Sequence, residues 1–136
     1  MPPELRDEVR EWLDKAGRDL RAAEVVVAVD PVLRGIACLH CQQAAEKSLK
    51  AFLAWRQTAF RKSHELRYLL RLCAATEPGF QGLREAAETL TPYAQDFRYP
   101  GRRTDPSPDE TGRALQLARE VLAFVLERLP DEVRTP

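Results

Sequence analysis

The segment from Arg34 to Trp55 reads RGIACLHCQQAAEKSLKAFLAW and decides the fold of this chain. It contains no proline, and most of its residues are strong helix formers, so the sequence predicts one uninterrupted helix. Successive residues lie about 100° apart around a helix, which gathers small and apolar side chains on one broad arc. The arc consists of Ala37, Cys38, Cys41, Ala44, Ala45, Ser48, Leu49, Ala51 and Phe52. Small side chains let other helices approach closely, so we expect a central helix surrounded by others.

The opposite arc of this helix carries a polar seam. The seam consists of His40, Gln43, Glu46, Lys47 and Lys50, and it is interrupted by Ile36, Leu39 and Ala54. An arc of this mixed character is too apolar for a free surface, and polar groups on a largely enclosed helix require partners. We therefore expect function to lie along the seam.

Composition indicates one soluble domain. A chain of 136 residues has the usual size of a single domain, which we expect to span residues 1–136, with a core at about 3–129 and a frayed tail at 130–136. Lys plus Arg and Asp plus Glu both number 21, so no global field attracts nucleic acid or a membrane. The sequence contains no long apolar run and no signal-like N-terminus, which predicts a cytoplasmic protein.

Apolar residues outside the central segment also repeat at intervals of three and four, and prolines mark the ends of the repeats. The predicted helices lie near residues 3–29, 32–56, 64–76, 80–97 and 108–129. Ser63 is expected to cap the third helix, Thr91–Pro92 to bend the fourth, and Ser107–Pro108–Asp109–Glu110 to form a capping box. No segment alternates as a strand would. The predicted fold is all-α, an up-and-down bundle of four long helices plus one short helix.

Three motifs carry a family resemblance. The run from His40 to Ala51 resembles the signature helix of the HEPN domains, helical proteins of prokaryotes and higher eukaryotes that are often linked to nucleotide binding. Ser63–His64–Glu65–Leu66 resembles the entry to the family's third helix, and Arg98–Tyr99–Pro100–Gly101 resembles the turn before its last helix. The resemblance extends from about Trp12 to Leu129 and implies the same helical bundle.

No complete catalytic set is visible in the sequence. There is no nucleophile elbow, P-loop or dinucleotide fingerprint, and no carboxylate pair suggests a metal or acid–base site. HEPN ribonucleases carry Arg followed by four to six residues and His near the last helix. After Arg98 the candidate positions hold Arg103, Thr104 and Asp105 instead. Arg34 and His40 meet the spacing only on the central helix, where we interpret it as coincidence. We predict no catalytic residue and no cofactor.

The three cysteines are expected to be buried apolar residues rather than metal ligands. Cys38 and Cys41 are neighbours on a helix, but His40 points about 100° or more away from both, and no second ligand pair follows. We predict no metal site.

Cationic and aromatic residues gather in three places that could bind a nucleotide or RNA. Arg can hold phosphate through two parallel hydrogen bonds, and Tyr can stack on a base. Arg61 and Lys62 lie beside His64 in the second connection, and Arg103 lies in the last loop. The predicted nucleotide- or phosphate-binding residues are Gln43, Lys47, Lys50, His64, Arg98, Tyr99 and Arg102. The alternative is that these cations are merely solvated or paired with acidic residues.

The resemblance implies a function in company with another protein. HEPN proteins are frequently encoded beside a small nucleotidyltransferase, as two-component or toxin–antitoxin systems. We expect a non-catalytic partner of such a transferase and, from abundant apolar positions and the family's common dimers, a homodimer or higher multiple. Two alternatives stay open: a metal-independent HEPN-type ribonuclease toxin, and a helical scaffold without a ligand.

Overall fold

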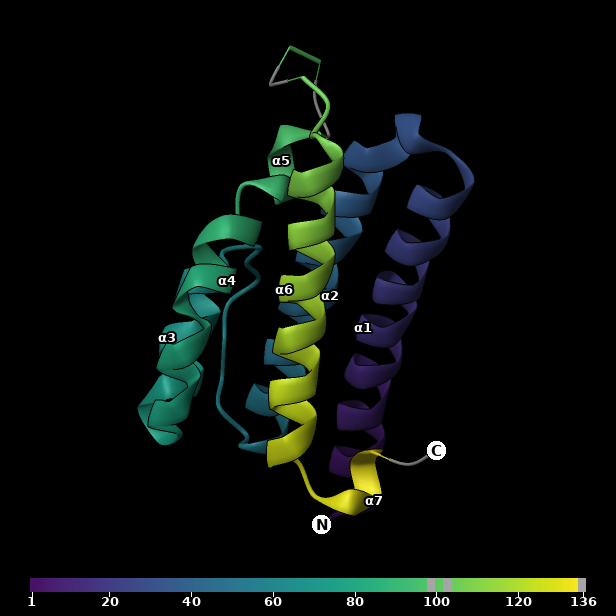
Figure 1. Ribbon diagram of the computed structural model, residues 1–136. Helices are drawn as coiled ribbons and strands as arrows, with labels where there is room; N and C mark the ends of the chain where they lie inside the picture. Colours follow the sequence, from purple (N-terminus) through teal and green to yellow (C-terminus); the bar gives the residue numbers. More distant parts are fainter. Residues whose placement is uncertain (98–99, 102–103, 135–136) are drawn as a thin grey trace.

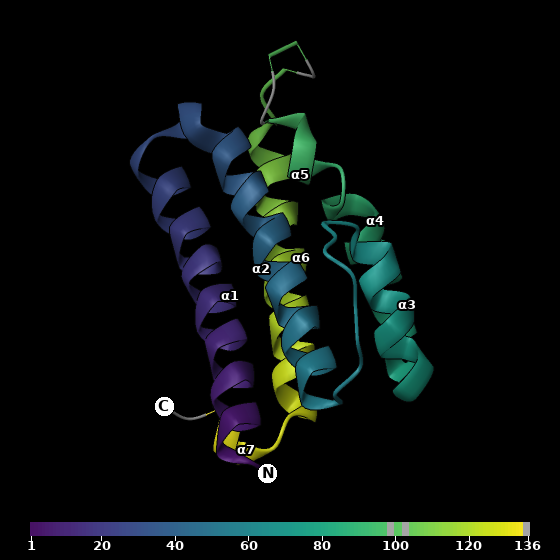
Figure 2. The ribbon, with the colours of Figure 1, turned by 180° about the vertical axis from the view of Figure 1, so that it is seen from behind.

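A computed structural model describes residues 1–97, 100–101 and 104–134. Three long helices form its centre: α1 (Pro3–Val29), α2 (Arg34–Trp55) and α6 (Pro108–Arg128) (Figure 1). A second group, α3 (Leu66–Thr76) and α4 (Arg84–Leu90), lies beside α2 on the side away from α1 (Figure 2). Shorter elements join them: the 3₁₀ helices η1 (Pro31–Leu33) and η2 (Pro78–Leu83), and the single turns α5 (Tyr93–Asp96) and α7 (Asp131–Arg134). The described residues contain no strand, so the predicted all-α bundle is confirmed.

Helix α2 is the centre of the bundle, as the sequence predicted. It packs against α1, α6 and α3, and every residue of the predicted apolar arc is buried. Gly35 shows how tightly its first turn is packed, because a Cβ atom there would lie 2.8 Å from the ring of Phe97. The helix ends at Trp55, where Gln57 adopts a left-handed conformation with φ of 53°. The Thr58 N–H then donates to the Leu53 carbonyl at 2.9 Å and closes the helix end.

The predicted third helix starts later than expected. Ser63 was expected to be its cap, but the structure places Glu65 there, with its side chain accepting a hydrogen bond from the Arg67 N–H. Ser63 instead accepts a hydrogen bond from the Glu65 N–H at 3.0 Å. Ser63 and His64 therefore belong to the connection between α2 and α3 rather than to a helix.

The predicted fourth helix, 80–97, is not one helix. Its first part is the 3₁₀ helix η2, which contains Gly79 and Gly82, residues with low helix propensity. After α4 the chain breaks at Thr91–Pro92, because proline lacks the donor that a helix interior requires. The sequence predicted a bend at this place, and the structure divides the segment into two helices, α4 and α5, joined by a turn at these two residues.

The last helix begins as predicted and the chain then continues beyond it. Ser107 accepts a hydrogen bond from the Glu110 N–H at 3.0 Å, which is one half of the expected capping box. The Glu110 carboxylate accepts a hydrogen bond from the Tyr93 hydroxyl at 2.7 Å and so ties α6 to α5. Where a frayed tail was expected at 130–136, residues 131–134 form α7, and its Val133 is buried.

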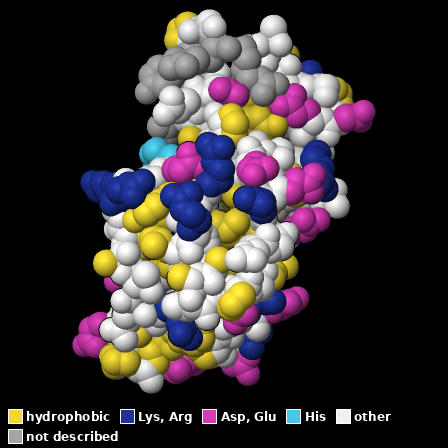
Figure 3. All heavy atoms as spheres, turned by 90° about the vertical axis from the view of Figure 1, so that its left-hand side faces the viewer, with side chains coloured by type: hydrophobic (Ala, Val, Ile, Leu, Met, Phe, Trp, Pro, Cys, Tyr) yellow, Lys and Arg dark blue, Asp and Glu magenta, His cyan; other side chains and the backbone are white. Residues whose placement is uncertain are grey.

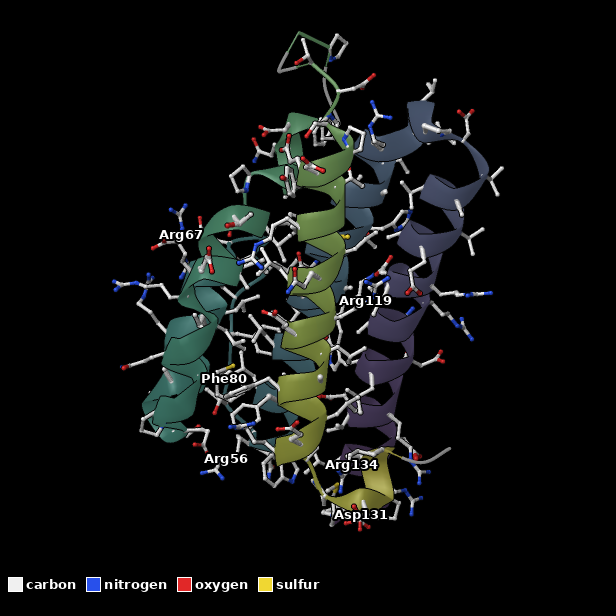
Figure 4. The ribbon with its side chains drawn as sticks, in the orientation of Figure 1. Arg56, Arg67, Phe80, Arg119, Asp131 and Arg134 are labelled. Atoms are coloured by element: carbon white, nitrogen blue, oxygen red, sulfur yellow. The ribbon has the colours of Figure 1, made fainter. Side chains whose placement is uncertain are left out.

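Aromatic side chains fill the end of the bundle near α7. Phe80 lies between the helices (Figure 4), with its ring centroid 4.5 Å from that of Phe52 and 4.8 Å from that of Phe124. These contacts fix η2 against α2 and α6.

Candidate polar site along helix α2

Two polar clusters flank α2. The first, which we call the Asp19 cluster, joins α1 to α2 and consists of Asp19, His40 and Lys47. The Asp19 carboxylate is 10% exposed and accepts a hydrogen bond from the Lys47 ammonium at 2.5 Å. Its other oxygen lies 2.9 Å from Nδ1 of His40. His40 and Lys47 are seven residues apart, so they lie on the same face of α2.

The second cluster, which we call the Glu46 cluster, consists of Gln42, Glu46, Lys50 and His64. The first three are spaced by four residues and form one stripe of α2. Oε1 of Glu46 accepts a hydrogen bond from Gln42 at 3.2 Å and lies 2.7 Å from Nδ1 of His64. Its Oε2 accepts one from Lys50 at 2.9 Å. Gln42 also donates to the His64 carbonyl at 3.0 Å, so the cluster holds both the backbone and the ring of His64.

The Glu46 carboxylate is ionised within this cluster. Burial by itself raises its pKa, but hydrogen bonds from His64, Lys50 and Gln42 outweigh burial and leave the pKa below its ordinary value. An ionised carboxylate can only accept hydrogen bonds, so the proton shared with His64 belongs to Nδ1 of the ring. In the neutral ring, Nε2 is then an acceptor.

Aromatic rings enclose the ammonium group of Lys50. Its Nζ atom lies 5.5 Å from the ring centroid of Trp12 and 5.7 Å from that of Phe60, and its side chain is 9% exposed. Trp12 and Phe60 also contact each other edge to face. Lys50 is therefore committed to Glu46 and to the two rings.

His64 is the exposed member of the Glu46 cluster. Its side chain is 54% exposed, whereas that of Glu46 is 6% exposed. The ring borders a surface hollow of about 370 Å³ whose wall includes Ser63, Thr91, Gln95 and Asp96. Asp96 immediately precedes Phe97, after which the chain enters segment 98–103. A buried network thus presents one imidazole to a polar hollow.

Four of the seven predicted site residues, Gln43, Lys47, Lys50 and His64, lie in the described part of the chain. His64 has the exposed position just described, while Lys47 is partly exposed beside Asp19 and Lys50 is enclosed. Gln43 is half-buried on α2 and makes no side-chain hydrogen bond to a described residue. Arg98, Tyr99, Arg102 and the neighbouring Arg103 lie outside the described residues.

Asp19 and Gln42 belong to the polar site but are not among the residues predicted from the sequence, and Glu46 was predicted only as part of the seam. The spacing of Gln42, Glu46 and Lys50 was a usable signal, since it places all three on one stripe. Asp19 gave no signal, because it lies among many charged residues of α1 and only packing shows that it is buried. Within the Glu46 cluster, Oε1 of Gln42 is buried and has no hydrogen-bond partner among the described residues.

The cysteines are free, buried thiols, as expected from their positions. Burial, together with the neighbouring Cys38, raises the pKa of Cys41 to about 12, and burial raises the pKa of Cys73 to about 12. These thiols are therefore protonated and unreactive near neutral pH.

Comparison with known proteins agrees with this architecture. The HEPN domain model matches residues 9–129. The chain resembles the crystal structure of TT1696 from Thermus thermophilus at 31% identity, covering 89% of this chain and 98% of that one, with a TM-score of 0.72. It shares the fold of ST0689, an archaeal HEPN homologue, at 24% identity, covering 88% and 96%, with a TM-score of 0.69. No curated protein matches it.

The protein is thus a helical bundle whose central helix, α2, carries a buried polar stripe. Since the family model covers most of its length, the chain belongs to the HEPN domain family. No helix in the described part of the chain has the length and apolar character to cross a membrane.

Proposed function

We propose that this HEPN protein is a nucleotide-associated module that acts with a separate nucleotidyltransferase. The proposal combines the family membership with the arrangement of His64. In a two-component or toxin–antitoxin system, this chain would hold the phosphates of a nucleotide while the partner supplies the metal and the chemistry.

The observation that carries the proposal is the buried network behind an exposed histidine. Removing Glu46 and Lys50 from water costs free energy that their mutual attraction only partly returns, so a buried ion pair is weak evidence for stability. The network is better explained by what it does to His64. It sets the tautomer and orientation of the ring, as a carboxylate does for a ligating or catalytic histidine.

Under this proposal, each of the other predicted site residues contacts or supports the bound nucleotide. His64 and Gln43 orient the ligand through hydrogen bonds, and Lys47 and the arginines at 98 and 102 neutralise phosphate charge. Tyr99 stacks on the base. Lys50, predicted to bind phosphate directly, contributes through Glu46, because its ammonium is enclosed.

The test is calorimetry with ATP and the other nucleoside triphosphates, with and without a neighbour-encoded transferase. We expect heat of binding that His64→Ala abolishes and that rising salt weakens. His40→Ala is the matched control, since His40 also has Nδ1 beside a buried carboxylate but belongs to the Asp19 cluster. If no nucleotide binds in either mixture and no transferase co-purifies, the scaffold interpretation replaces this one.

A second candidate is a metal-independent ribonuclease. The observation favouring it is that the exposed His64 ring has its Nδ1 2.7 Å from the buried Glu46 carboxylate, which is the arrangement of a general base and the carboxylate that orients it. Purified protein would then cleave RNA in the presence of EDTA. Arg98→Ala and His64→Ala would each abolish cleavage, while His40→Ala would leave it intact. Cleavage that survives both substitutions would exclude this site.

We also propose self-association through the tip of the α1–α2 hairpin. Val25, Val29, Val32 and Ile36 are exposed there, and Val29 is 77% exposed. Exposed apolar side chains that cluster in this way are typical of contact surfaces. Light scattering should give a multiple of the 15.5 kDa chain mass, and Val29→Asp with Val32→Asp should lower it. A monomer mass at micromolar concentration would reject the proposal.

A further inference from the structure

A groove separates α3 from η2 and α4, on the face away from α1. It has a volume of about 630 Å³, and Arg67, Arg71 and Arg84 form its lips. Leu70, Ala74 and Ala87 contribute an apolar floor. Figure 3 shows the same face, with dark-blue Lys and Arg side chains near yellow hydrophobic surface and magenta Asp and Glu side chains among them. We call this feature the arginine groove.

The arginines differ in how far they are already paired. Arg67 is held by two hydrogen bonds from its side chain to Glu65, at 2.7 and 3.1 Å, and points outward from α3 (Figure 4). Arg84 has its carboxylate partner, Glu88, at 3.6 Å, which is beyond hydrogen-bond distance. Arg71 has no ion pair with any described residue. The groove therefore has three arginines and one carboxylate, that of Glu88, among its lining residues, and Arg71 is the arginine without an ion pair to a described residue.

We propose that the arginine groove binds an acidic amphipathic helix of a partner protein. An apolar floor between cationic lips complements a helix with an apolar stripe and flanking carboxylates. A nucleic-acid strand fits less well. None of the described residues that line the groove is aromatic, so bases have no ring to stack on. A helix can place carboxylates opposite Arg71 and Arg84 and apolar side chains on the floor between them.

The groove adjoins the polar hollow beside His64. Glu65 lies in the wall of that hollow, and its partner Arg67 lies at the lip of the groove. A protein docked in the groove would therefore lie next to the hollow beside His64. The inference rests on the proposed function in one respect, the existence of a partner chain.

Fluorescence anisotropy with synthetic peptides tests the groove directly. The probe is a capped, labelled helical peptide with a leucine stripe flanked by glutamates, and its counterpart carries lysines in place of the glutamates. We expect the full chain to bind the acidic peptide and not the basic one. Arg71→Glu and Arg84→Glu should each weaken binding about fivefold to tenfold. Arg21→Glu is the matched control, since Arg21 is exposed on α1 and has no ion pair with a described residue.

Three outcomes would overturn the inference: no binding of the acidic peptide, equal binding of the basic peptide, or binding unchanged by Arg71→Glu and Arg84→Glu. A labelled oligouridine that binds and is lost in Arg71→Glu would assign the groove to nucleic acid instead. Failure of the proposed function would be recognised from different variants. His64→Ala should leave peptide binding intact, and Arg71→Glu should leave the heat of nucleotide binding intact, so each proposal has its own sensitive variant.

Discussion

The two polar clusters on α2 are built from the same kinds of side chain in different surroundings. Each has a carboxylate, a lysine and a histidine whose Nδ1 lies within about 3 Å of the carboxylate, at hydrogen-bond distance. In the Asp19 cluster the lysine and the histidine are 24% and 30% exposed. In the Glu46 cluster the lysine is enclosed and the histidine is 54% exposed. The two clusters therefore differ in surroundings rather than in residue types: only the Glu46 cluster combines an enclosed lysine with an exposed histidine.

The largest expected difference between the clusters is in stability. Glu46→Ala leaves the Lys50 ammonium enclosed between Trp12 and Phe60 without a counter-charge, at a cost of about 3–5 kcal/mol. Asp19→Ala should cost about 1–2 kcal/mol, since Lys47 and His40 can reach water. Urea denaturation of both variants measures the difference. Equal costs would show that enclosure of the lysine does not matter.

Replacing both charges of the Glu46 cluster separates stability from positioning. Glu46→Leu combined with Lys50→Met removes the whole buried pair, and the double variant should lie within about 2 kcal/mol of the original chain, because apolar replacement of a buried ion pair is often neutral. His64 would then lose its carboxylate. We expect a folded protein by circular dichroism whose nucleotide binding is lost. Retained binding would argue that the network is structural only.

Acid should destabilise the chain partly through Glu46. Its folded-state pKa lies below the ordinary value of 4.5, so its contribution to stability is fully present above about pH 4.5. That contribution is lost as the pH falls through the folded-state pKa. Glu46→Gln should therefore flatten the decline in unfolding free energy between neutral and acidic pH, measured by urea titrations at several pH values. An unchanged acid limb would contradict the assignment.

The smallest expected effects come from the histidines themselves. His64→Ala and His40→Ala should each change stability by no more than about 1 kcal/mol, because both carboxylates keep a lysine partner. Only His64→Ala should alter ligand binding. A large loss of stability in His64→Ala would instead make that residue part of the folding core, and its binding defect would then be indirect.

Sequence patterns predicted the helices correctly where they depend on residues close together in the chain. The apolar arc of α2 and the Ser107 cap depend on residues close in sequence, and both are confirmed. The predicted helix at 80–97 is wrong as a single element. The glycines of η2 and Pro92 each weaken a helix, and tertiary packing decides whether the helix continues through them. Local propensity does not decide that balance.

The sequence by itself determined the all-α bundle, the central position of α2 and the presence of a polar seam on it. Helix periodicity repeats every few residues, so it can be read from the order of side chains alone. Only the tertiary structure decided which polar residues meet. Asp19 reaches His40 across 21 positions and Glu46 reaches His64 across 18, and such contacts depend on how helices and connections pack. Whether a lysine is enclosed or exposed depends on rings from distant segments, Trp12 and Phe60, which no local pattern specifies.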